Sequence, residues 1–142
     1  MIYKEEQRDL FTVGDEYYFA HCISADFALG AGIAAKFDRR FRCRDMLRAF
    51  YGFSGYDEPG YVLPTGRVFN LVTKQKYWQK PTYKTMRLAL EDLKEALRIR
   101  KITKIAMPRI GCGLDRLEWE TVRRMIQYIF ADTDVEILVC WQ

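Results

Sequence analysis

Histidine is nearly absent from this sequence, and its scarcity excludes several kinds of site. His21 is the only one, so a Ser-His-Asp triad or a general-base histidine would have to use that residue. A metal centre built from several histidines is excluded. The four cysteines Cys22, Cys43, Cys112 and Cys140 form no C-x-x-C pair, which argues against a zinc framework or a secreted disulfide pattern. We expect reduced thiols, no metal and no cofactor, and an enzyme here would rely on Lys, Asp, Glu, Ser or backbone groups.

Long apolar runs, repeats and linkers are also missing. No stretch approaches the ~20 apolar residues of a transmembrane helix. The first ten residues, MIYKEEQRDL, carry charges too early for a secretory signal. The 142 residues suit one domain spanning positions 1–142, since domains typically have ~100–150 residues. We expect a monomer that does not contact membranes, located in the cytoplasm, or in the nucleus of a eukaryote.

The charge balance is only mildly basic. The chain has 23 Lys and Arg against 19 Asp and Glu, a net charge of +4, with both signs interspersed. An excess of this size does not by itself indicate a nucleic-acid partner. The cluster Arg39, Arg40, Arg42 and Arg44 is interpreted as a solvated helix face or, at most, a phosphate-contacting patch.

Apolar spacing predicts alternating helices and strands in the second half of the chain. Residues 82–99 read as an amphipathic helix with Thr82 as its N-cap. A short strand around residues 105–107 follows, then a glycine loop, a second helix over residues 117–131 and a strand over residues 135–141. Helices and strands joined by short connections are typical of an α/β sheet with crossover helices.

The first half fits the same class. Residues 17–24 and the RVFNLVTK segment read as strands, and a helix begins at GIAAKFDRRF. The RDMLRAFYG segment extends or restarts this helix. The stretch FSGYDEPGYVLPTG is rich in Gly and Pro and is expected to be irregular. About five or six strands and three or four helices result.

Two strand-to-helix junctions carry glycines, Gly30 and Gly32 at the first and Gly111 and Gly113 at the second. Glycine lets backbone N–H groups face a ligand, and a following helix N-terminus adds unpaired donors. Such loops form anion cradles at the carboxyl ends of strands. Two of them suggest a diphosphate, although each loop alone could be a tight turn.

Long motifs at these positions resemble the macrodomain family, and more narrowly its terminal ADP-ribose protein glycohydrolase type. The motifs are HCISADFALGAGIAAKF, LVTK, KPTY and MPRIGCGLDRLEWE. The similarity runs from about residue 2 to the C-terminus. It implies a three-layer α/β/α sandwich with a central mixed sheet of about six strands, and ADP-ribose as the ligand.

The resemblance also implies a set of ligand-binding residues. The two glycine loops would line the diphosphate and the distal ribose, while the aspartate of RDLF would take the adenine amino group. The C-terminal strand end would lie near the adenine. The substrate-binding residues expected in this way are Asp9, Leu10, Ser24, Gly30, Ala31, Gly32, Ile33, Arg109, Ile110, Gly111, Cys112, Gly113, Leu114 and Gln142.

Lys74 and Asp115 match the catalytic lysine and aspartate of the family. A neutral lysine amine can attack the anomeric carbon of the distal ribose and displace an acyl group. A carboxylate opposite can move protons and activate water. Without the resemblance, Lys76 and Lys80 are equal candidates, and Asp115 could simply cap the following helix together with Glu118.

Three functions remain open at this stage. The first is a hydrolase that removes mono-ADP-ribose from acidic side chains of modified proteins and cleaves esters such as O-acetyl-ADP-ribose. The same site could remove ADP-ribose from nucleic acid in an antitoxin-type activity. The second is a reader module that binds ADP-ribose without turnover. The third is a nucleic-acid binder that uses the arginine cluster, which the small charge excess makes the weakest candidate.

Overall fold

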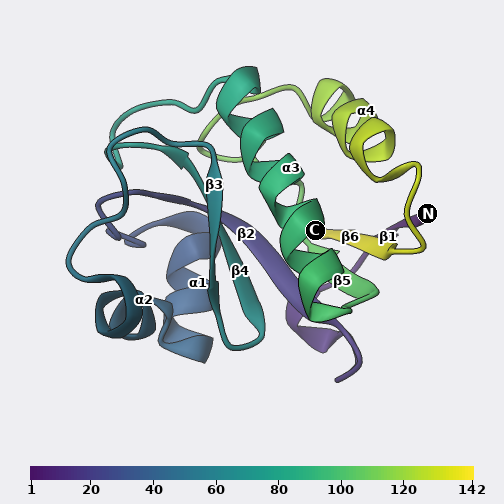
Figure 1. Ribbon diagram of the computed structural model, residues 1–142, viewed down its shortest axis with the longest axis horizontal. Coiled ribbons are helices and arrows are strands. Elements are labelled where there is room, and N and C mark those ends of the chain that lie inside the picture. Colours follow the sequence, from purple (N-terminus) through teal and green to yellow (C-terminus); the bar gives the residue numbers. More distant parts are fainter.

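A computed structural model describes residues 1–142 as a six-stranded sheet with helices on both faces (Figure 1). The strand order is β1-β6-β5-β2-β4-β3, and only β3 runs antiparallel to its neighbour. No helix is both long and apolar enough to span a bilayer. The strands are β1 (Ile2–Gln7), β2 (Tyr18–Ser24), β3 (Tyr61–Thr65), β4 (Val68–Lys74), β5 (Lys104–Met107) and β6 (Glu136–Trp141); the helices are the 3-10 turn η1 (Leu10–Thr12), α1 (Gly32–Phe41), α2 (Cys43–Tyr51), α3 (Tyr83–Arg100) and α4 (Trp119–Phe130).

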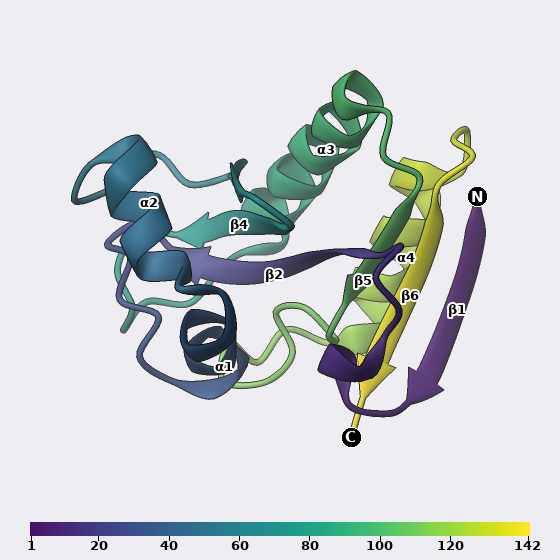
Figure 2. The same ribbon diagram turned by 90° about the horizontal axis from the view of Figure 1, so that it is seen from below.

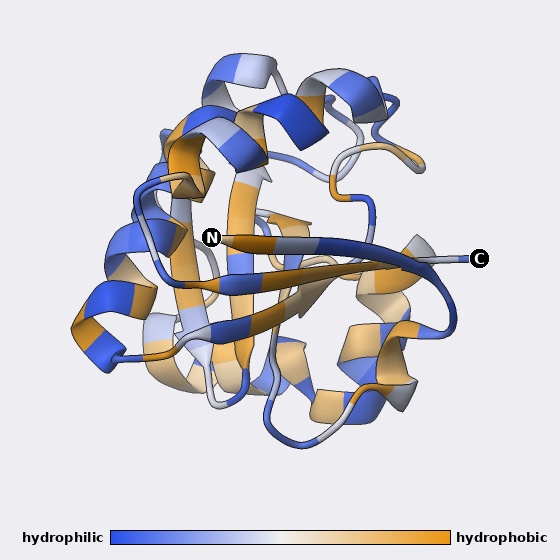
Figure 3. Ribbon diagram, turned by 90° about the vertical axis from the view of Figure 1, so that its right-hand side faces the viewer, coloured by the Kyte–Doolittle hydropathy of each residue, from blue (hydrophilic) through white to orange (hydrophobic).

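The central sheet is buried on both faces. Ile105 and Met107 of β5 join a core that includes α3 and α4, whereas the intervening Ala106 joins a second core with α1 and α2. Figure 2 shows the two helix pairs on opposite sides of the sheet, and Figure 3 shows the apolar residues of the inner strands. Because successive side chains of a strand face opposite ways, each apolar strand supplies both cores. The predicted three-layer α/β/α sandwich with a mixed sheet is confirmed.

The helix predictions hold closely. Thr82 caps α3, and its side chain accepts a hydrogen bond from the Thr85 N–H at 3.1 Å. The chain restarts a helix after α1 rather than extending it, because Arg42 adopts a left-handed conformation with φ of 53° between α1 and α2.

The two edge strands are where sequence patterns failed. The stretch expected to be irregular contains β3, which includes Pro64. Proline is tolerated there because β3 is an edge strand with only one hydrogen-bonded neighbour. The sequence predicts no strand at β1, whose consecutive charged residues Lys4, Glu5 and Glu6 suit the opposite edge of the sheet.

His21 lies fully buried in β2. Its Nε2 is 2.6 Å from Asn70 Oδ1, and its ring stacks on Phe37 with 4.0 Å between centroids. Burial lowers the pKa of His21 to about 4. Its neutral imidazole therefore contributes to the core and not to the cleft described below.

This burial predicts that stability falls as the pH drops from 7 to 5. The unfolded imidazole, with a pKa of about 6.5, binds a proton in this range while the folded one does not. The expected loss in unfolding free energy is about 2 kcal/mol. Urea denaturation at several pH values measures it, and His21→Phe should flatten the slope between pH 6.5 and 5. An equal slope in the variant would refute the assignment to His21.

Candidate active site

The sheet opens between β2 and β5 at their carboxyl ends. Their pairing is confined to Tyr18 with Ile105 and Phe19 with Ala106, so the last residues of β2 run free of β5. The chain leaves β2 towards α1 on one face of the sheet, and leaves β5 towards α4 on the other. Such a switch point leaves a crevice outside the strand ends, where open α/β sheets bind ligands.

Two connected cavities occupy this crevice. The larger has a volume of about 1140 Å³ and the smaller about 580 Å³. They share the first glycine loop, the residues just before the second, and the C-terminus, so they form one elongated cleft. The residues lining both cavities are Gly30, Ala31, Gly32, Ile33, Pro108, Arg109, Trp141 and Gln142.

The two glycine loops touch across this cleft. Gly32 has φ of 60°, and a Cβ on it would lie 3.2 Å from Leu114 Cδ1. The first loop leads directly into α1, whose N-cap Ala31 has no side-chain cap, so N–H groups there remain available. The second loop differs from the expectation, because α4 begins only at Trp119, beyond a turn closed by the Leu117 N–H to the Gly111 carbonyl at 2.7 Å.

Gly111 is the more constrained glycine of the second loop. It has φ of 74°, and a Cβ there would lie 2.7 Å from Met86 Cε and 2.9 Å from Leu117 Cδ1. Gly111→Ala is therefore expected to lower the unfolding free energy by about 1–3 kcal/mol and to weaken ligand binding at the distorted loop. Gly113→Ala is the matched control, because nothing lies within 4 Å of its Cβ position. Calorimetric melting of both variants tests this, and equal melting temperatures would contradict it.

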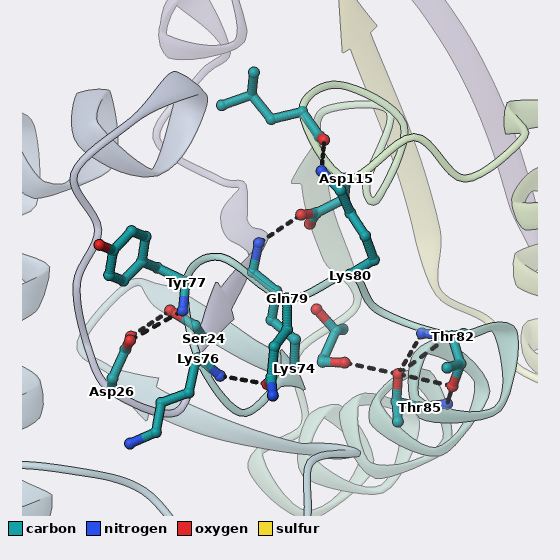
Figure 4. A network of polar contacts seen from close by, with 12 residues as sticks. Ser24, Asp26, Lys74, Lys76, Tyr77, Gln79, Lys80, Thr82, Thr85 and Asp115 are labelled. Carbon is teal, nitrogen blue, oxygen red and sulfur yellow. Dashed lines mark hydrogen bonds and ion pairs between the residues drawn. The ribbon is translucent and has the colours of Figure 1, made fainter.

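Lys74 and Asp115 meet in the lining of the larger cavity. The Lys74 ammonium lies 2.6 Å from Asp115 Oδ1, and their side chains are only 14% and 16% exposed (Figure 4). Lys74 stands at the end of β4 and Asp115 in the second loop, so the sheet topology brings them together. Lys80 instead donates to the Leu114 carbonyl at 2.7 Å, and Lys76 lines neither cavity. The geometry thus singles out Lys74 among the three candidate lysines.

Helix capping does not explain Asp115. The N-cap of α4 is Glu118, which makes no side-chain capping bond. The Asp115 carboxylate instead faces Lys74. The alternative in which Asp115 and Glu118 form a capping box is therefore wrong.

Asp26 was not predicted, and it joins the loop that follows β2 to the segment that follows β4. Its carboxylate accepts hydrogen bonds from the Ser24 hydroxyl at 2.5 Å, the Ala28 N–H at 3.1 Å and the Tyr77 N–H at 2.9 Å (Figure 4). Burial alone would raise the pKa of Asp26, but these hydrogen bonds outweigh it and hold the pKa below its usual value. Ser24 lines the larger cavity, with its hydroxyl engaged in this network. No motif marks Asp26, whose role depends on contacts distant in sequence.

The two cysteines of the cleft are poor nucleophiles. Cys22 and Cys112 both line the larger cavity. Burial raises the pKa of the Cys112 thiol to about 11, and burial also raises the pKa of Cys22 well above its usual value. Both therefore remain thiols at neutral pH, since the thiolate is the reactive form. Among the groups that line this cavity, Lys74 is therefore the better candidate for the nucleophile and Asp115 for the proton carrier.

Asp9 and Leu10 line the smaller cavity, at the other end of the cleft. Asp9 Oδ1 accepts the Phe11 N–H at 2.9 Å and so caps η1. Arg109 lies over the Trp141 ring at 4.4 Å, and its guanidinium is 3.8 Å from Glu5. All the expected catalytic and binding residues thus line one cavity or both. Their roles in binding and catalysis remain predictions.

Comparisons with known proteins agree with this architecture. The family described as Macro domain matches residues 58–126. ADP-ribose glycohydrolase OARD1 of Homo sapiens is 41% identical over 132 residues, which cover 92% of this chain and 86% of that protein. The Bos taurus protein of the same name is 40% identical over the same length.

Solved structures share the fold at lower sequence identity. The macrodomain of Thermus aquaticus DarG superposes with a TM-score of 0.83 and 19% identity, covering 99% of this chain and 98% of that one. Thermosipho africanus DarTG in complex with ADP-ribose gives a TM-score of 0.77 and 16% identity, covering 99% of this chain and 42% of that one. The motifs, the fold and the identity to the two curated relatives converge, and the chain belongs to the macrodomain family.

Proposed function

We propose that the protein is a hydrolase that releases ADP-ribose from ester linkages to acidic side chains of modified proteins. The observation that carries the proposal is the Lys74–Asp115 pair, 2.6 Å apart in a cavity that is also lined by two glycine loops. The curated relatives are ADP-ribose glycohydrolases with about 40% identity, which supports the same class of activity. Small esters such as O-acetyl-ADP-ribose present the same bond and are included.

The cleft offers ADP-ribose a place for each of its parts. We assign the adenine to the smaller cavity beside Asp9 and Leu10, the diphosphate to the two glycine loops, and the distal ribose to the larger cavity near Lys74. Backbone N–H groups of the loops and the N-terminus of α1 suit a diphosphate because they donate without carrying bulk. The fold neighbour DarTG binds ADP-ribose, which supports this ligand.

The ion pair provides a route for the proton that the reaction must move. Lys74 passes a proton to Asp115, and the neutral amine attacks the anomeric carbon of the distal ribose. The new C–N bond forms as the C–O bond to the acyl group breaks, and the acyl group leaves as a carboxylic acid with the proton from Asp115. The ribose ring then opens: the bond from this carbon to the ring oxygen breaks, a proton passes from the nitrogen to that oxygen, and a protonated imine to Lys74 results. Asp115 activates water, which adds at the imine carbon; a proton returns to the nitrogen through Asp115, the C–N bond breaks, and ADP-ribose is released with its ring free to close again.

A paired measurement separates the hydrolase from a reader. Isothermal calorimetry with ADP-ribose measures binding, and an assay of ADP-ribose release from an auto-modified protein measures turnover. Binding with turnover is expected. Binding without turnover of a protein ester or of O-acetyl-ADP-ribose would show a reader module, and turnover of ADP-ribosylated nucleic acid alone would identify the antitoxin-type activity.

A further inference from the structure

Three cations line the adenosine end of the cleft and have no part in the assignment above. Arg8 follows β1, while Lys36 and Arg39 are exposed on α1, three residues apart and so on one face of the helix. All three line the smaller cavity and none lines the larger. We call Arg8, Lys36 and Arg39 the adenosine-end cluster.

Two members of this cluster have no charge partner in the protein. Lys36 and Arg39 take part in no ion pair. Arg8 is 3.0 Å from Glu6 and donates to the Thr12 carbonyl at 2.7 Å, so its charge is partly neutralised. The smaller cavity is lined by the basic residues Arg8, Lys36, Arg39 and Arg109 and by one acidic residue, Asp9. The cations therefore outnumber the carboxylate and create a positive potential there, which favours an anion.

The net charge of the protein points to the same region. Residues 32–51, which form α1 and α2, contain six basic and two acidic residues. The rest of the chain therefore has 17 basic residues, from 23 less six, and 17 acidic residues, from 19 less two, so it is neutral. The whole excess of +4 lies on the helix pair that borders the cleft, where Lys36 and Arg39 line the smaller cavity and Arg44 and Arg48 line the larger one.

The diphosphate of ADP-ribose does not account for these cations. Its place is between the two glycine loops, of which the first lines both cavities and the glycines of the second line the larger one, whereas the cluster lines only the smaller cavity, together with Asp9. An anion that reaches Lys36 and Arg39 must be attached at the adenosine end of the ligand. The position that can carry one is the ribose next to the adenine.

We propose that the adenosine-end cluster binds a phosphate carried by this ribose, so the preferred ligand is ADP-ribose extended at its adenosine end. The inference depends on the proposed function. The phosphate is either a monoester on the ribose or part of the diphosphate of a second, attached ADP-ribose unit. In both cases, Lys36 and Arg39 contribute two charges that unmodified ADP-ribose leaves unused.

Calorimetry with three ligands tests the proposal: ADP-ribose, ADP-ribose 2′-phosphate and a dimer of ADP-ribose. We expect at least one extended ligand to bind the wild-type protein about fivefold more tightly than ADP-ribose at low salt. The preference should shrink at high salt, because screening weakens contacts between exposed charges. If only ADP-ribose 2′-phosphate binds more tightly than ADP-ribose, the cluster binds a phosphate monoester. If only the dimer does, the cluster binds the diphosphate of the second ADP-ribose unit.

Two variants assign any preference to the cluster. The double substitution Lys36→Gln with Arg39→Gln should remove the preference while leaving the affinity for ADP-ribose within about twofold. Lys101→Gln is the control, because this exposed lysine lies before β5, at the opposite end of the parallel strands. Equal affinity of the wild type for all three ligands, or a preference that persists in the double variant, would overturn the inference. Failure of the proposed function would look different, because it would appear as the absence of ADP-ribose release in the turnover assay, whatever the relative affinities of the three ligands.

Discussion

Lys74→Ala is expected to slow ADP-ribose release at least about a thousandfold while leaving the dissociation constant for ADP-ribose within a few fold. The side chain contributes the attacking amine but only a small part of the cleft wall. Loss of turnover with retained binding is the behaviour of a group that acts in the transition state. Single-turnover release from an auto-modified protein, together with calorimetry, measures both quantities.

Asp115→Asn tests the proton transfer from Lys74 to Asp115, because it removes the proton acceptor and keeps the shape of the side chain. The amide keeps the shape of the side chain but cannot take the proton from Lys74, which lies 2.6 Å from the carboxylate. We expect a rate at least about a hundredfold below wild type. The rate losses of Lys74→Ala and Asp115→Asn should not add when both substitutions are combined, because both residues serve the same chemical step.

Lys76→Ala is the matched control for both variants. Lys76 lies two positions beyond Lys74 in the same segment but lines neither cavity. Its substitution should leave turnover near the wild-type rate. If Lys74→Ala released ADP-ribose as fast as Lys76→Ala, the assigned mechanism would be wrong.

Phe37→Ala is expected to lower the unfolding free energy by about 3–5 kcal/mol, because it opens a large hole in a closed cluster. The Phe37 ring is fully buried and contacts Phe11 at 5.0 Å, Phe19 at 5.9 Å and His21 at 4.0 Å between centroids. Phe37 also belongs to α1, the helix that follows the first glycine loop. Urea denaturation at pH 7 measures the loss.

Phe53→Ala provides the comparison on the surface. The Phe53 ring is 84% exposed, and its loss should change the unfolding free energy by at most about 0.5 kcal/mol. Phe37→Leu, which fills more of the hole, should fall between the two. Equal stabilities for Phe37→Ala and Phe53→Ala would show that the aromatic cluster does not support the fold.

Sequence patterns are strong where a segment has one buried face and a local stop signal. The α3 helix has apolar residues at helical spacing and the Thr82 cap, so its bounds were predicted almost to the residue. The edge strands β1 and β3 lack such signals, since their residues are partly exposed and β3 contains Pro64. Their pairing is decided by neighbours distant in sequence, which local patterns do not contain.

The candidate site shows the same division. The two glycine loops were evident from the sequence, but the contact between Lys74 and Asp115 joins residues 41 positions apart and depends on how β4 and β5 flank β2. The family resemblance selected Lys74 over Lys76 and Lys80, and the geometry agrees with that choice. Asp26 and the separation of α4 from its glycine loop required the fold itself.

The covalent step at Lys74 is the central claim, and reductive trapping tests it most directly. Borohydride added during turnover of an ADP-ribosylated protein would reduce an imine between the lysine and the ring-opened distal ribose to a stable amine. Peptide mass spectrometry should then find the ADP-ribose mass on Lys74 in the wild-type protein and no adduct at this position in Lys74→Ala. Full turnover with no trapped adduct on Lys74, or an adduct on another residue that persists in Lys74→Ala, would contradict the account.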